Sequence, residues 1–212
     1  MKAIVFVHPG YLLVDEIKLR AYIKSNKIYG SYKKYLENLK RLHANANGST
    51  VYILERNNGE FDKCHEGFEP KEDSLVIAWP RGSNWKIFGG LEHRARWTET
   101  GVFSLNNLAD FLLQNNINEA LLAGELGPYY NHSYGCVGRV HSLFSNKIAV
   151  RGIMDCIFPT VPYRYHVSPK IRKEYRGMQK QLPGLVTEEQ LELEFRKRES
   201  VLRDLYDNAV EI

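Results

Sequence analysis

The most chemically varied stretch of the sequence is 125–136, which combines a glutamate, three tyrosines, a histidine and a cysteine. Cys136 follows Gly135 at the expected start of a helix, where the helix dipole and unpaired N–H groups stabilise a thiolate. This position predicts that Cys136 is a nucleophile and that the N–H groups around it stabilise an oxyanion. The general base would then be His8 or His132. The competing interpretation is that Cys136 is a small residue buried where a strand meets a helix.

Such a site needs elements that bring distant segments together. In open α/β sheets, ligands bind beyond the carboxyl ends of the strands. Four segments are expected at that edge: 8–11, 80–82, 125–136 and 155–156. The residues predicted to bind substrate there are Tyr11, Glu125, Tyr130, Tyr134 and Gly135, with Arg94 or Arg96 orienting an anionic substrate.

Hydrophobic patterning predicts the sheet itself. Continuous apolar runs at 3–7, 50–54, 75–79, 120–123 and 148–150 are typical of buried parallel strands. Apolar residues at helical spacing lie between them, in 32–42, 104–112 and 137–144. This alternation predicts one three-layer α/β/α domain over residues 1–160 with a mostly parallel, Rossmann-like sheet. Residues 56–73 are expected to form a loop or a frayed hairpin, and residues 81–102 show no clear period.

The character of the chain changes after residue 160, so residues 161–212 are expected to form a basic linker and a C-terminal helix. Residues 163–184 contain six Lys and Arg but one acid, Glu174. Thr187 and Gln190 form a capping box that begins a long helix with a narrow apolar stripe. Such a helix packs on its own domain or on a second subunit, and we expect a homodimer formed through it.

Composition excludes several classes of protein. The chain has 212 residues, of which 43% are hydrophobic and 25% charged, which excludes a disordered, collagenous or coiled-coil protein. Three cysteines without close pairing favour a reducing, cytoplasmic compartment. No run approaches the ~18 apolar residues of a membrane span. Neither glycine-rich phosphate-loop pattern occurs, so no dinucleotide cofactor is expected, and no other cofactor is implied.

Residues 103–155 resemble the second half of the isochorismatase-like cysteine hydrolases. The matching pieces, in chain order, are Phe103, Leu108, Leu112, Ile117, the run 121–124, the pair Cys136 and Val137, the run 148–150, and Asp155. The resemblance implies an α/β hydrolase of a small, anionic amide or ester-like substrate. The family pairs its cysteine with an aspartate closing the first strand and a lysine before the Phe motif. Here the first strand ends in His8, and the bases before Phe103 are Arg94 and Arg96.

The sequence also contains residues that could form a nucleic-acid site or a metal site. Arginines interleaved with aromatics suit a nucleotide or nucleic acid, so the alternative function is a non-catalytic binding protein on the same scaffold. The residues concerned are Arg81, Lys86, His93, Arg94, Arg96, Trp97 and the segment 163–166. His132, Cys136 and His141 match no zinc signature, so no metal is expected and His141 is placed on a helix surface.

Overall fold

A seven-stranded sheet organises the chain. The computed structural model describes residues 1–11, 32–54, 56–57, 60–61, 67–79, 84–92, 96–104, 107–125, 135–158 and 188–211. The strand order is β7-β6-β5-β2-β1-β8-β9. Five of these strands are parallel: β1 (Lys2–Val7), β2 (Thr50–Leu54), β5 (Leu75–Ala78), β8 (Glu119–Gly124) and β9 (Ala149–Ile157). These are the five strands that the apolar runs predict.

The remaining strands form an antiparallel hairpin at one edge of the sheet, β6 (Asn84–Glu92) and β7 (Arg96–Ser104). The sequence showed no clear period over residues 81–102 and so did not indicate this hairpin. The pairing register shifts between Ile87 and Phe88 and again between Gly89 and Leu91. Each such irregularity breaks the two-residue alternation that identifies a strand in sequence. The expected hairpin in 56–73 is present as two short strands, β3 (Arg56–Asn57) and β4 (Glu60–Phe61).

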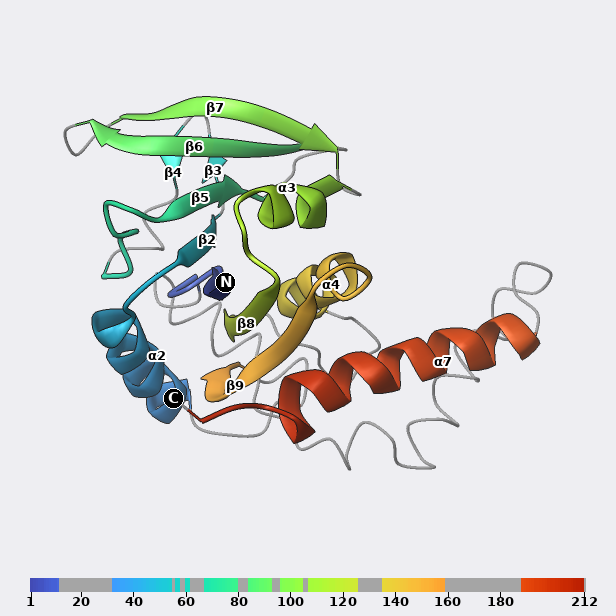
Figure 1. Cartoon of the computed structure of the whole chain (residues 1–212). Coiled ribbons are helices and arrows are strands. Elements are labelled where there is room, and N and C mark those ends of the chain that lie inside the picture. Colours follow the sequence, from blue (N-terminus) through green and yellow to red (C-terminus); the bar gives the residue numbers. More distant parts are fainter. Residues whose placement is uncertain are drawn as a thin grey trace.

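Helices cover both faces of the sheet, which confirms the three-layer α/β/α class (Figure 1). On one face, α2 (Tyr32–Asn45) packs its buried side chains against Phe6 and Tyr52. On the other face, α3 (Leu108–Gln114) and α4 (Gly135–Phe144) share a core with Val5 and Val7. Neighbouring residues of β1 thus enter opposite cores, because side chains alternate along a strand. A strand buried on both faces is the reason that its sequence is continuously apolar.

The C-terminal segment packs on this domain. It consists of α7 (Glu188–Leu202) and a π-helical turn (Arg203–Asp207), and Val201 and Leu205 are buried in the core beneath α4. The chain then runs beside β9, where the Val210 N–H donates to the Gly152 carbonyl at 2.9 Å. A Cβ at Gly152 would lie 2.0 Å from the Leu205 carbonyl oxygen, so only glycine allows this approach. None of the described helices is both long and apolar enough to cross a membrane.

Candidate active site at the carboxyl edge of the sheet

The strand order reverses at β1, which lies between β2 and β8. From β1 the chain proceeds outward through β2 and β5, and it then returns to the other side of β1 as β8 and β9. In doubly wound sheets, the crevice at such a reversal is the usual place for a ligand. Here that point lies beyond Val7 and Gly124, which are register partners at the ends of β1 and β8. His8 and Glu125 follow them directly.

The ends of β1 and β8 approach each other closely. The Glu125 N–H donates to the Val7 carbonyl at 2.9 Å. Gly124 has φ 136°, and a Cβ there would lie 1.9 Å from the Val7 carbonyl oxygen. Glycine at position 124 is therefore what allows Glu125 to turn in beside the end of β1.

His8 is fully buried in an aromatic environment at the end of β1. Its ring centroid lies 4.8 Å from that of Trp79 and 5.7 Å from that of Tyr11. Its backbone has φ 46°, a left-handed conformation that is uncommon for residues other than glycine. The His8 N–H donates to the Ile53 carbonyl at 2.9 Å, and the His8 carbonyl accepts from the Tyr11 N–H at 3.2 Å. Backbone strain of this kind persists where surrounding contacts impose it, and it is found most often at functional sites.

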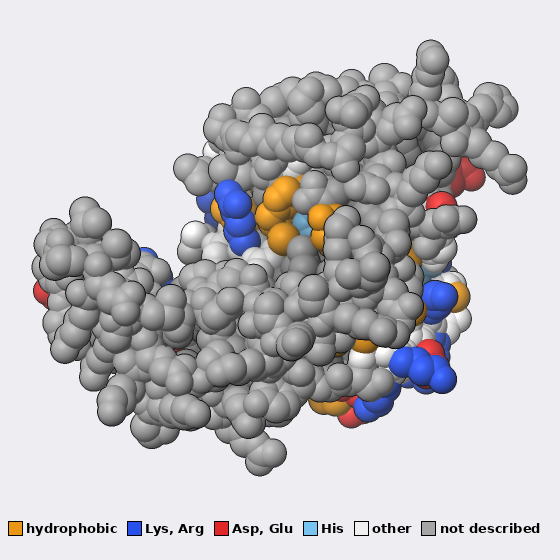
Figure 2. Space-filling model, turned by 180° about the vertical axis from the view of Figure 1, so that it is seen from behind, with side chains coloured by type: hydrophobic (Ala, Val, Ile, Leu, Met, Phe, Trp, Pro, Cys, Tyr) orange, Lys and Arg blue, Asp and Glu red, His pale blue; other side chains and the backbone are white. Residues whose placement is uncertain are grey.

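Trp79 connects His8 to α4. It follows β5, and its N–H donates to the Leu54 carbonyl at 2.7 Å. The Arg139 guanidinium lies 5.7 Å from the centre of its ring, within the range of a cation–π interaction. Figure 2 shows a face on which hydrophobic side chains gather around a histidine beside a Lys or Arg side chain.

Cys136 lies in the first turn of α4, directly after Gly135, whose φ is 60°. Its side chain is partly buried against the same core as Trp79. Cys136 and Arg139 are three residues apart, so they are neighbours on the helix surface. Trp79 therefore links the His8 ring to Arg139, which lies one helical turn beyond Cys136.

Glu125 occupies the other face of the same edge. It is fully buried, and its Oε1 accepts a 2.7 Å hydrogen bond from the Tyr32 hydroxyl at the start of α2. Burial, and then the charge of Glu125, raise the pKa values of Tyr32 and Tyr35 well above their ordinary value. Both phenols therefore stay protonated, and Tyr32 remains a hydrogen-bond donor to the carboxylate at any physiological pH.

The predicted site residues divide into two groups. Those that the structure brings to one edge are His8, Tyr11, Glu125, Gly135 and Cys136. His132, Tyr130, Tyr134 and Arg94 lie outside the described residues, and Arg96 begins β7, where only the backbone is described.

Sequence reasoning missed Tyr32, Trp79 and Arg139. Two signals could have found two of them: Trp79 ends a predicted strand at this edge, and Arg139 follows Cys136 by one helical turn. The expectation that His141 lies on the helix surface is wrong. It is 2% exposed, and its Nε2 lies 2.9 Å from the Asp204 carboxylate. The π-helical turn that carries Asp204 covers this side of α4, and sequence spacing does not show that contact.

In the part of the chain that the structure describes, no three His, Cys, Asp or Glu side chains are grouped so as to hold a metal ion. Cys156, the other described cysteine, is buried near the end of β9. Burial and the charge of Asp155 raise the pKa of its thiol to about 11. It is therefore a neutral thiol at pH 7, unsuited to nucleophilic attack.

Comparison with models of known families and with curated sequences gives no match. Two solved structures align with most of the chain. N-carbamoylsarcosine amidase from Thermoplasma acidophilum aligns at 15% identity and a TM-score of 0.40, covering 84% of this chain and 92% of that one. An isochorismatase-like hydrolase from Alkaliphilus metalliredigens aligns at 14% identity and a TM-score of 0.44, covering 92% of this chain and 96% of that one.

Proposed function

We propose that this chain is a cysteine-dependent hydrolase of a small, anionic amide or ester-like substrate. The observation that carries the proposal is that Trp79, at the carboxyl edge of the sheet, contacts both the His8 ring and Arg139, which lies one helical turn beyond Cys136 on α4. Cys136 supplies the nucleophile, and His8 supplies the base, with His132 as the alternative. Tyr11, whose ring lies 5.7 Å from that of His8, is proposed to contact the substrate.

In the proposed reaction, the Cys136 sulfur attacks the carbonyl carbon of the substrate while the histidine takes the thiol proton. N–H groups in the first turn of α4 stabilise the oxyanion that forms. The histidine then protonates the leaving amine or alcohol, which departs and leaves a thioester on Cys136. Water, deprotonated by the same histidine, hydrolyses the thioester and releases the carboxylic acid and the free thiol.

An anionic substrate suits the Arg139 side chain at this edge. The Arg139 guanidinium lies over Trp79, one turn of α4 beyond Cys136. A guanidinium binds carboxylate or phosphate through two parallel hydrogen bonds. Arg139 therefore joins Arg94 and Arg96 as a residue that we propose to orient the substrate.

The first test is the reactivity of Cys136 itself. We expect iodoacetamide to alkylate Cys136 below neutral pH faster than it alkylates an ordinary thiol with a pKa of ~8.5. Cys156 in the same sample is the internal control, because burial raises the pKa of its thiol to about 11. Mass spectrometry of tryptic peptides measures both rates. If Cys136 reacts no faster than an ordinary thiol, it is not an activated nucleophile.

The second test is turnover. We expect the wild-type protein to hydrolyse p-nitrophenyl acetate with an initial burst of p-nitrophenol, and Cys136→Ser to abolish the burst while Cys156→Ser retains it. A nucleotide-binding protein without turnover, the alternative function, would instead show no burst and would bind nucleotide with an affinity that falls steeply as salt rises.

A further inference from the structure

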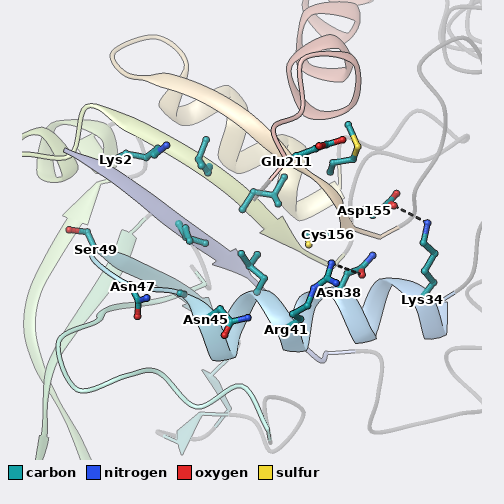
Figure 3. A pocket seen from close by; sticks show the side chains of 16 residues that line it. Lys2, Lys34, Asn38, Arg41, Asn45, Asn47, Ser49, Asp155, Cys156 and Glu211 are labelled. Atoms are coloured by element: carbon teal, nitrogen blue, oxygen red, sulfur yellow. Dashed lines mark hydrogen bonds and ion pairs between the residues drawn. The ribbon is translucent and has the colours of Figure 1, made fainter.

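A groove of about 850 Å³ lies between α2 and β9, on the face of the sheet opposite α4 (Figure 3). Its volume falls within the roughly 300–1,000 Å³ range of pockets that hold small molecules. It is separated from Cys136 by the sheet, so it is a second place for a ligand, independent of the proposed active site.

One wall of the groove is a polar stripe of α2. The side chains in this stripe lie three or four residues apart and therefore share one face of the helix: Lys34, Asn38, Arg41 and Asn45. The eleven residue steps from Lys34 to Asn45 span about 16 Å of helix. Figure 3 shows Lys34, Asn38, Arg41 and Asn45 spaced along this helix beneath the strands. The wall thus offers hydrogen-bond donors along its whole length.

The floor of the groove is apolar. It is formed by Ile4 of β1, Leu121 of β8 and Ile153 of β9, together with the Cys156 thiol. The raised pKa of Cys156 keeps that thiol uncharged. A ligand held between this floor and the polar stripe needs an apolar body as well as a group that accepts hydrogen bonds.

The charges in the groove favour an anion. Lys34 and Asp155 form an ion pair at 2.9 Å and satisfy each other. The other charged residues of the lining are Lys2, Arg41 and Glu211, two cations against one carboxylate. Among the described residues, the Arg41 guanidinium has one hydrogen-bond partner, Asn38 Oδ1 at 3.4 Å. Most of its donors are therefore available to a ligand.

We propose that this groove binds an elongated organic anion. The anionic group lies on the Arg41 guanidinium beside the Asn38 amide, and the apolar body lies along the sheet over Ile4 and Leu121. The anion is a phosphate or a carboxylate, because both match the planar donor pattern of arginine.

The test uses 1-anilinonaphthalene-8-sulfonate, an aromatic anion that fluoresces when it binds an apolar surface, titrated onto the full chain. We expect Arg41→Gln to weaken its binding about tenfold, the loss of a hydrogen bond to a charged group. The matched control is Lys40→Gln, which removes an exposed cation from the adjacent position of α2, outside the groove. We expect Lys40→Gln and Cys136→Ser to bind the probe as the wild type does.

Three outcomes would overturn the proposal: no binding of the probe to the wild type, equal affinities of the Arg41→Gln variant and the wild type, or equal weakening by Lys40→Gln. Asn38→Trp, which fills the groove from the surface of α2, provides a second variant and is expected to exclude the probe. Competition then identifies the anion. Displacement by phenyl phosphate alone assigns a phosphate, and displacement by phenylacetate alone assigns a carboxylate. Displacement by neither, or equally by benzyl alcohol, contradicts an anion site.

Discussion

At the scale of single residues, His8 and Glu125, which follow β1 and β8, face different neighbours. The His8 ring lies among aromatic rings on the side of Trp79, whereas the Glu125 carboxylate turns toward α2 and accepts from Tyr32. In the proposed reaction the histidine exchanges protons, and the glutamate holds the start of α2 in place. Glu125 was expected to bind substrate, and that role stays a prediction beside the contact with Tyr32.

The Tyr32 contact leads to a prediction about stability. Tyr32→Phe removes a donor from a fully buried carboxylate and is expected to lower the free energy of unfolding by about 1.5–3 kcal/mol. Urea denaturation followed by circular dichroism measures the change. Lys33→Gln is the neighbouring control and should change stability by under about 0.5 kcal/mol, because it disrupts only an exposed Lys33–Glu37 pair. A loss for Tyr32→Phe no greater than that of the control would contradict the importance of this hydrogen bond.

At the scale of elements, the junction of β1 with β8 depends on a glycine. Gly124→Ala would drive a Cβ into the Val7 carbonyl and keep an unfavourable positive φ, so we expect a loss of at least about 3 kcal/mol. Gly48→Ala is the matched control, because Gly48 also has a positive φ, of 94°, but a Cβ added there would meet nothing within 4 Å. It should cost about 1 kcal/mol. Equal losses in thermal and urea denaturation would show that the close approach does not matter.

A second element-scale contact joins α4 to the C-terminal segment through His141 and Asp204. Burial lowers the pKa of His141, and the hydrogen bond to Asp204 offsets part of that shift. The unfolded chain therefore binds a proton more readily than the folded one once the pH falls toward the ordinary value of about 6.5. The contribution of neutral, buried His141 to stability is therefore fully present above that pH and is lost as the pH falls below it.

We expect the free energy of unfolding to decrease between pH 7.5 and pH 5.5, and the decrease to be smaller in His141→Gln. Burial also lowers the pKa of His43, so the variant should reduce the slope without removing it. Urea denaturation at a series of pH values measures both slopes. An unchanged slope in the variant would show that His141 does not titrate in this range.

At the scale of the whole molecule, the described side chains of the C-terminal segment include both buried and exposed apolar residues. Val201 and Leu205 belong to the domain core, whereas Leu193 is 53% exposed on α7. The homodimer expected from the sequence would use the part of α7 around Leu193, because Val201 and Leu205 are already buried in the chain's own core.

We expect Leu193→Glu to convert a dimer into a monomer without loss of secondary structure, as measured by size-exclusion chromatography with light scattering. The control is Arg196→Gln, an exposed substitution on the same helix that leaves Leu193 in place. An oligomeric state unchanged by Leu193→Glu would exclude this part of α7 as the main contact between subunits.

The five parallel strands and their helices could be predicted because each carries its own local signal. A strand buried on both faces is continuously apolar, as in β1, and a helix on a sheet has a periodic apolar stripe, as in α2. The β6–β7 hairpin could not be predicted, because its register shifts remove the alternation that marks a strand. The position of three candidate residues in the fold could be predicted, because His8 and Glu125 directly follow predicted strands and Cys136 begins a predicted helix, whereas their role in a site stays a prediction.

The sequence by itself determined the class of fold and the edge of the sheet where polar side chains gather, since both depend on patterns within a single segment. Only the tertiary structure decided the strand order, and with it which strand ends are neighbours. It brought the Trp79 ring into contact with both His8 and Arg139, turned Glu125 toward Tyr32, and covered His141 with the C-terminal segment. These contacts join residues far apart in the chain, and hydrophobic periodicity carries no information about which distant segments meet.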